Sequence, residues 1–186
     1  MDKDITAKKP GLLCRQPDDA LCESFIFRNI RREEAEQAAL IEEICFPPNE
    51  ACSKEMMMER IERAPEFFLV AEDKEGGKIA GFLSGLATDE ELFRDEFFKD
   101  ADMHNPDGRN IMLLGLDVLP AYRGRGLATE LMRRYLVRER DNDRHTVILT
   151  CLDAKVNMYE KMGFIDEGIS ASAWGGEQWH EMRYKL

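Results

Sequence analysis

The chain has 186 residues, of which 44% are hydrophobic and 34% are charged, and its formal net charge is −11. These values fit one globular domain and argue against sequence-independent nucleic-acid binding, which needs basic surfaces. No apolar run approaches the about 20 residues of a membrane span, and the polar start lacks the apolar stretch of a signal peptide, so we expect a cytoplasmic protein without membrane contact.

Proline, glycine and aspartate interrupt the first part of the chain, so we expect residues 1–24 to form an N-terminal extension and residues 25–186 to form a single domain. Within the domain, apolar residues follow either strand or helix spacing. In chain order these patterns predict a strand at 25–30, helices at 33–45 and 54–64, strands at 67–71 and 79–87, a helical insertion at 88–105, a strand at 111–119, a helix at 126–140, a strand at 146–151, a helix at 155–162, and strands at 164–172 and 177–184.

The most apolar run of the chain, residues 111–119, predicts a central strand that is covered on both faces. The strong helix at 126–140 follows it directly. This order of elements predicts the α/β class, with a mixed, mostly antiparallel sheet between helices on both faces.

The five cysteines lie far apart, and no Cys-x-x-Cys pair occurs. The three histidines, His104, His145 and His180, are also widely separated. We therefore expect free thiols, no disulfide framework and no metal site.

The segment from Leu116 to Thr129 joins the central strand to the strong helix through a turn rich in arginine and glycine. The first N–H groups of a helix lack internal partners and lie at the positive end of its dipole. Gly124 and Gly126 would let a phosphate approach the backbone, and Arg123 adds charge, so the segment predicts a pyrophosphate site. The Gly-Lys-Ser/Thr of a P-loop is absent, and the third glycine of a dinucleotide fingerprint is missing, which leaves coenzyme A.

Two motifs carry a family resemblance. Arg123-x-x-Gly126-x-Ala128 resembles the (Gln/Arg)-x-x-Gly-x-(Gly/Ala) signature of the GNAT N-acetyltransferase superfamily, and the segment from Tyr159 to Phe164 resembles its second marker, (F/L)YxxxGF. The resemblance covers about residues 25–186. It implies the GNAT acyl-CoA N-acyltransferase fold, with acetyl-CoA as cosubstrate and no metal.

Two further segments, 89–92 and 150–154, are similar to the arylalkylamine (serotonin-type) branch of that superfamily. This narrower resemblance implies transfer of acetyl from acetyl-CoA to a small primary amine. The acidic composition is compatible with a cationic substrate of this kind, because an acidic surface attracts amines at long range.

The resemblance also implies roles for individual residues. The central strand would pair with the pantetheine arm through its backbone, and residues 124–129 would hold the pyrophosphate. Tyr159 matches the tyrosine that protonates the departing thiolate as a general acid. The implied coenzyme A contacts are Leu116, Asp117, Val118, Arg123, Gly124, Arg125, Gly126, Leu127, Ala128 and Thr129.

A general base is expected too, because an alkylammonium with a pKa of about 10 must lose a proton before it attacks a carbonyl. The vertebrate enzymes use two histidines on the central strand, but Met112 and Leu114 occupy those positions here. Insect and fungal relatives use a glutamate after the first helix, and Glu50 stands at the matching place, where it could act through a water chain. Asp117 is the second choice.

Two alternatives stay open beside the small-amine enzyme. A protein or peptide N-acetyltransferase would need an open groove, and a non-catalytic acyl-CoA-binding module would not need Tyr159. The acidic insertion with Phe93, Phe97 and Phe98 favours a lid over a small substrate, and its aromatic rings would suit an arylalkyl group.

Overall fold

The computed structural model describes residues 11–186, and these form one seven-stranded sheet in the order β1-β2-β3-β4-β5-β7-β6. The strands are β1 (Phe25–Asn29), β2 (Phe68–Asp73), β3 (Ile79–Thr88), β4 (Asn110–Val118), β5 (Thr146–Cys151), β6 (Ile165–Ile169) and β7 (His180–Lys185). Neighbouring strands are antiparallel except β4 and β5, which are parallel. The predicted mixed, mostly antiparallel sheet is confirmed.

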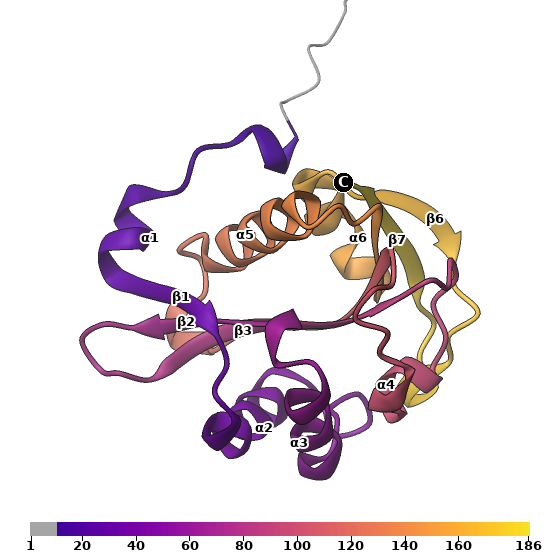
Figure 1. The fold of residues 1–186 in the computed structure, drawn as a ribbon, viewed down its shortest axis with the longest axis horizontal. Coiled ribbons are helices and arrows are strands. Elements are labelled where there is room, and N and C mark those ends of the chain that lie inside the picture. The colour runs from indigo at the N-terminus through magenta and orange to yellow at the C-terminus, as the bar shows by residue number, and fades with distance from the viewer. Residues whose placement is uncertain (1–10) are drawn as a thin grey trace, which may run out of the picture.

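Helices cover both faces of the sheet, as Figure 1 shows, with α2 and α3 below it and α5 above it. The helices are α1 (Asp19–Ser24), α2 (Ala35–Cys45), α3 (Lys54–Arg63), α4 (Glu96–Lys99), α5 (Leu127–Asp141) and α6 (Asp153–Met162). The predicted helices at 33–45, 54–64, 126–140 and 155–162 all form, with ends shifted by one or two residues. Such shifts are expected, since helix ends fray.

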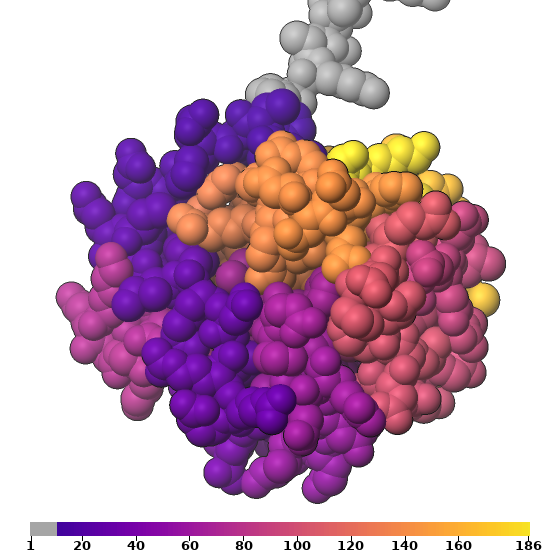
Figure 2. Space-filling model, viewed as in Figure 1, coloured from indigo at the N-terminus to yellow at the C-terminus, as the bar shows by residue number. Residues whose placement is uncertain are grey.

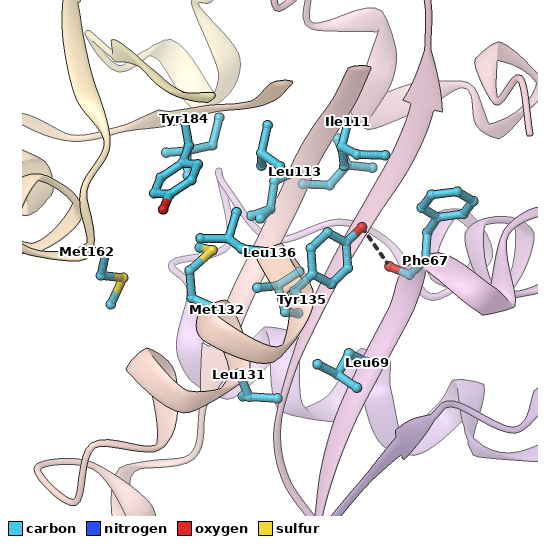
Figure 3. Packing of buried hydrophobic residues seen from close by; sticks show 14 of the residues in the cluster. Phe67, Leu69, Ile111, Leu113, Leu131, Met132, Tyr135, Leu136, Met162 and Tyr184 are labelled. Atoms are coloured by element: carbon cyan, nitrogen blue, oxygen red, sulfur yellow. Dashed lines mark hydrogen bonds between the residues drawn. The ribbon is translucent and has the colours of Figure 1, made fainter. Parts of the chain in front are cut away.

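Each face of the sheet has its own hydrophobic cluster. On the α5 side, Leu131, Tyr135 and Leu136 are fully buried against the strands, because leucine-rich spacing puts one helix face into the core. The Tyr135 hydroxyl donates to the carbonyl of Phe67 at 3.3 Å (Figure 3). On the other side, α2 and α3 pack over β2 and β3 around Phe82. A sheet buried on both faces holds β4 rigidly in the middle.

Two helix ends are set by local residues. The Ser53 side chain accepts the N–H of Met56 at 3.2 Å and caps α3. Gly163 follows α6 with a φ of +100°, the left-handed conformation in which glycine ends helices. Both turns set the direction in which the chain enters the sheet.

The described part of the N-terminal extension packs on the domain. Leu12 and Leu21 are buried in the same cluster as α5. Asp18 caps α1 by accepting the N–H of Leu21 at 3.2 Å, and Arg134 of α5 stacks over Phe27, with 4.1 Å from its guanidinium carbon to the ring centre. The rest of the predicted extension, residues 1–10, lies outside the described residues.

The prediction of a helical insertion at 88–105 is largely wrong. The strand β3 continues to Thr88, and the segment contains only the four-residue α4 and one 3-10 turn, Ala101–Met103. Short polar side chains compete for the backbone here: the Thr88 hydroxyl accepts the N–H of Glu90, and Asp100 accepts the N–H of Asp102. The segment is therefore a folded loop.

Candidate active site

The sheet opens between β4 and β5. The two strands pair only between residues 110–112 and 146–148, after which β4 continues along β3 and β5 continues along β7. Strand separation leaves backbone groups of β4 facing the opening, and an extended ligand can pair with such an edge as an added strand. Leu116, Asp117 and Val118, the predicted pantetheine contacts, lie on this part of β4.

The turn between β4 and α5 presents backbone N–H groups. Gly124 has a φ of +74° and Gly126 a φ of +84°, which only glycine adopts without strain. Gly126 is the N-cap of α5 and has no side chain that could cap the helix. The first hydrogen bond of the helix runs from the N–H of Glu130 to the carbonyl of Gly126. The N–H groups of the three preceding helical residues, 127–129, therefore have no intrahelical acceptor, and such groups can bind an anion.

Two side chains fix this turn to the sheet. The Nε of Arg123 donates to the carbonyl of Val118 at 2.8 Å. The Tyr122 hydroxyl donates to Oδ2 of Asp73 at 2.7 Å, and this bond lowers the pKa of Asp73. Arg123 thus combines a positioning contact with the positive charge that the sequence predicts beside the phosphates.

A cavity of about 1000 Å³ adjoins the first turn of α5. Thr129 lines it from α5, Asn157 and Lys161 line it from α6, and Arg15 lines it from the N-terminal segment. Figure 2 shows that segment in indigo against the orange surface of α5. Two cationic side chains and a helix N-terminus around one cavity suit a ligand that carries several phosphates.

Tyr159 lies at the deep end of α6, with 8% of its surface exposed. Its ring packs edge-on against Phe164, with 5.7 Å between ring centres. Burial, followed by the charges of Cys151 and Asp117, raises the pKa of the Tyr159 phenol. Tyr159 belongs to the same buried cluster as Val118 of β4 and Cys151 of β5, and its phenol stays protonated at neutral pH, as a general acid must.

A buried polar cluster lies on the α2 side of β4. The carboxyl group of Asp117 is fully buried, as is most of Glu42 on α2, and the Ser84 hydroxyl of β3 lies beside them. Burial, and then the charge of Glu42, raises the pKa of Asp117 well above its usual value. The predicted coenzyme A contact Asp117 therefore directs its side chain to the opposite side from the α5 turn, and Glu42 and Ser84 join it without having been predicted as site residues.

Glu50 lies in the loop between α2 and α3. Burial, and then the charge of Glu177, raises the pKa of its carboxyl group. Its backbone carbonyl accepts the indole N–H of Trp174 at 2.7 Å, and Asn49 donates to the carbonyl of Gly175 at 2.9 Å. These bonds join the α2–α3 loop to the β6–β7 loop, so Glu50 lies where the two loops meet.

The expected histidine positions are occupied by buried apolar residues, Met112 and Leu114. The histidines elsewhere make local contacts: His180 lies 3.0 Å from Oδ2 of Asp166, and Nδ1 of His104 accepts a backbone N–H of β3 at 3.2 Å. Neither His104 nor His180 is brought to β4. Within residues 11–186, no group of three or more His, Cys, Asp or Glu side chains is arranged to hold a metal ion, and no helix is both long and apolar enough to cross a membrane.

A helix N-terminus that faces the opening between two parallel strands suits an extended ligand with a phosphate-bearing end. The model of the acetyltransferase (GNAT) family matches residues 33–164, which is more than half of the chain. The chain belongs to the GNAT acetyltransferase family, as the two motifs predicted.

Individual proteins also resemble this chain. A serotonin N-acetyltransferase from Mesocricetus auratus is 31% identical over 113 residues, 60% of this chain and 53% of that protein, so the chain spans about half the length of this curated relative. The loading GNATL domain of CurA from Lyngbya majuscula has a TM-score of 0.74 at 15% identity and covers 87% of this chain and 97% of its own. The yncA protein of Salmonella typhimurium, solved with its cofactor acetyl-CoA, has a TM-score of 0.61 at 16% identity. The match covers 87% of this chain and 94% of that protein.

Proposed function

We propose that this chain transfers an acetyl group from acetyl-CoA to a small primary amine. The observation that carries the proposal is the burial of Tyr159 in one cluster with Val118 of β4 and Cys151 of β5, the two strands that separate after residues 112 and 148. An acetyl-CoA molecule held along β4 would bring its sulfur to this opening, with its pyrophosphate on residues 124–129 and its 3′-phosphate in the cavity. The phenol then protonates the departing thiolate.

Coenzyme A recognition in this proposal uses the predicted contacts in two ways. Leu116, Asp117 and Val118 contribute backbone groups on the free side of β4, and the turn contributes backbone N–H groups and two arginine charges. The acetyl-CoA-bound Salmonella protein shares this fold and supports acetyl-CoA as the cosubstrate. The reaction needs no metal, since direct attack by a neutral amine on a thioester requires only proton transfer.

A small substrate is favoured because two loops close the amine side of β4. The α2–α3 and β6–β7 loops are joined by the bonds of Asn49 and Trp174 described above, whereas a peptide substrate needs an open groove. Under these loops Trp174 stacks on Phe98 at 5.0 Å between ring centres, and Phe93 lies 5.1 Å from Phe98. An aromatic wall suits an arylalkyl group, in line with the serotonin N-acetyltransferase relative.

A thiol-release assay with acetyl-CoA and a panel of amines tests the proposal. Tryptamine and phenethylamine should be acetylated in preference to spermidine and to a lysine-containing peptide. Turnover of the peptide alone would favour the protein acetyltransferase. Acetyl-CoA binding without turnover of any amine would favour a non-catalytic acyl-CoA-binding module and overturn the enzyme.

A further inference from the structure

Three unpartnered oxygens from three elements converge above Gly115 in β4. A Cβ atom on Gly115 would lie 3.0 Å from Oδ2 of Asp117, 3.4 Å from Oγ of Ser84 and 3.6 Å from Oε2 of Glu42. Each of these atoms is buried and has no hydrogen-bond partner among the described residues. Because buried polar atoms are nearly always paired in folded proteins, three orphan oxygens around one point indicate a ligand that donates hydrogen bonds.

Among the described residues, neither carboxyl group of the cluster forms an ion pair: Glu42 accepts the backbone N–H of Cys52 at 3.2 Å, and both carboxyl oxygens of Asp117 have no hydrogen-bond partner. The buried guanidinium of Arg60 donates from Nη2 to the carbonyl of Phe98 at 2.7 Å, while its Nε and Nη1 have no partner among the described residues. Arg60 lowers the pKa of both Glu42 and Asp117, and Arg123 lowers that of Asp117, but burial outweighs them and both pKa values stay raised. Carboxyl groups that no cation contacts directly are complementary to a cation that donates hydrogen bonds to them.

The cluster adjoins the opening of the sheet. Ser84 pairs with Gly115, but Gly85 pairs with Leu113, so β4 bulges by one residue at Leu114. This bulge follows directly on the last residues of β4 that pair with β5. Asp117 also raises the pKa of the Tyr159 phenol, so the charges of the two groups are coupled. Bulges are common next to active sites because they redirect the strand.

We propose that Asp117, Glu42 and Ser84 form the binding site for the ammonium group of the substrate, and that the Asp117–Glu42 pair takes the proton that this ammonium must lose. The inference rests on the proposed acetyl transfer and names its base and its substrate-recognition site. An alkylammonium offers three N–H donors to three oxygen acceptors, and its charge suits two carboxyl groups that have no ion-pair partner among the described residues. Glu50, at the junction of the loops, then lies outside the proton-transfer step.

The proton balance is simple. One proton moves from R–NH3+ to the carboxyl pair, which leaves a neutral amine and a carboxylic acid. The nitrogen lone pair attacks the thioester carbonyl carbon, the C–S bond breaks, and the sulfur leaves with the electron pair and takes the phenol proton of Tyr159. The second surplus proton of the nitrogen restores the phenol. The carboxyl pair releases its proton to solvent after the products leave.

Isosteric variants test the site. Asp117→Asn should lower kcat/KM for the amine at pH 7.5 by about 100-fold, the usual contribution of a general base. Its rate should then rise about tenfold per pH unit toward pH 10, because the free amine replaces the missing base. Glu42→Gln should act in the same direction, and Glu43→Gln, at an exposed neighbouring position on α2, should match the wild type. The acetyl-CoA Kd should stay within about twofold in all three variants.

A stability measurement separates this role from a structural one. The folded-state pKa of Asp117 lies above its unfolded value. The contribution of Asp117 to the free energy of unfolding is therefore fully present below the unfolded pKa and is lost as pH rises through the folded pKa. Asp117→Asn removes that loss, so its Tm should exceed that of the wild type by an amount that grows from about pH 4 upward. The titratable and charged groups that face Asp117 are Glu42, Cys45, Cys52, Arg60, Arg123 and Tyr159.

The outcomes distinguish the two proposals. A wild type that turns over no amine but binds phenethylammonium in calorimetry, with binding lost in Asp117→Asn, would overturn the acetyl transfer and keep the ammonium site. A wild type that is active, with Asp117→Asn and Glu42→Gln retaining its pH profile, would overturn the ammonium site alone. A lower Tm in Asp117→Asn than in the wild type would also overturn the ammonium site. So would a Glu50→Gln variant that loses rate at pH 7.5 and regains it toward pH 10, because Glu50 would then be the base.

Discussion

The indole N–H of Trp174 donates to the backbone carbonyl of Glu50 at 2.7 Å, and this bond joins two loops that are distant in sequence. A second bond, from Asn49 to the carbonyl of Gly175 at 2.9 Å, lies beside it. Together they hold the α2–α3 loop against the β6–β7 loop. We expect these bonds to open and re-form when an amine enters, so they would couple substrate entry to loop motion.

The loop contact predicts the behaviour of Trp174→Phe. Phenylalanine keeps an aromatic ring against Phe98 but lacks the N–H, so the closed form loses one hydrogen bond worth about 1 kcal/mol. The KM for the amine should rise about fivefold, while the Kd for acetyl-CoA should not change. Steady-state kinetics and calorimetry check this. An unchanged amine KM would mean that the loops do not close over the substrate.

The Tyr159 phenol predicts a different kinetic pattern. Tyr159→Phe should lower kcat by about 100-fold with little change in acetyl-CoA binding, because the thiolate loses its proton donor. Burial raises the pKa of Tyr159, so deprotonation of this phenol should not limit the wild-type rate at neutral pH. Tyr184→Phe is the matched control, since Tyr184 packs on the other side of Phe164 at 5.3 Å. Equal rates in wild type and Tyr159→Phe would exclude the acid role.

Much of this fold follows from the sequence because local signals agree with tertiary packing. The central strand is a continuous apolar run, α5 has one apolar stripe, and Ser53 and Gly163 mark helix ends. The prediction of a helical insertion at 88–105 was wrong because the phenylalanines at helical spacing are buried there by a folded loop. Hydrophobic spacing reports burial, and the competing side-chain bonds of Thr88 and Asp100 decide against a long helix.

The candidate site likewise contains some residues that the sequence predicts and others that it does not. The α5 turn and Tyr159 are motif positions whose backbone conformation is set by adjacent residues, so sequence alone predicts them. Glu42 and Ser84 come together only through the packing of α2 on the sheet, which no local pattern shows. One signal was present: Glu42 lies four residues after Ala38 and one after Ile41, so it falls on the apolar face of α2. Burial of an unpaired carboxylate there costs folding free energy, so its presence indicates a functional role.

The glycine turn predicts a loss of cofactor affinity in Gly126→Ala. An alanine at a φ of +84° is strained by about 1–2 kcal/mol, and relief of that strain would displace the N–H groups of residues 127–129. The Kd for acetyl-CoA should rise about tenfold or more. Gly76→Ala is the control, because its Cβ would make an ordinary 3.8 Å contact with Asp73. Equal affinities in the two variants would place the pyrophosphate elsewhere.

The cavity beside α5 predicts where the 3′-phosphate of coenzyme A binds. Arg15 and Lys161 line the cavity from the N-terminal segment and from α6, and both side chains are exposed, so each should contribute only about 0.2–1 kcal/mol. Arg15→Ala and Lys161→Ala should each raise the acetyl-CoA Kd by about two- to fivefold at low ionic strength. The effect should shrink at 0.5 M salt, where the Debye length falls to about 4 Å.

A ligand without the 3′-phosphate separates this contact from one to the diphosphate. Dephospho-acetyl-CoA should bind the wild type, Arg15→Ala and Lys161→Ala equally, because the group that the two cations recognise is missing. Lys155→Ala, at an exposed position of α6 outside the cavity lining, should behave as the wild type with both ligands. If both variants weaken the two ligands equally, the cations act on the diphosphate. If neither variant weakens either ligand, the adenosine end lies outside this cavity, and the N-terminal segment has no part in cosubstrate binding.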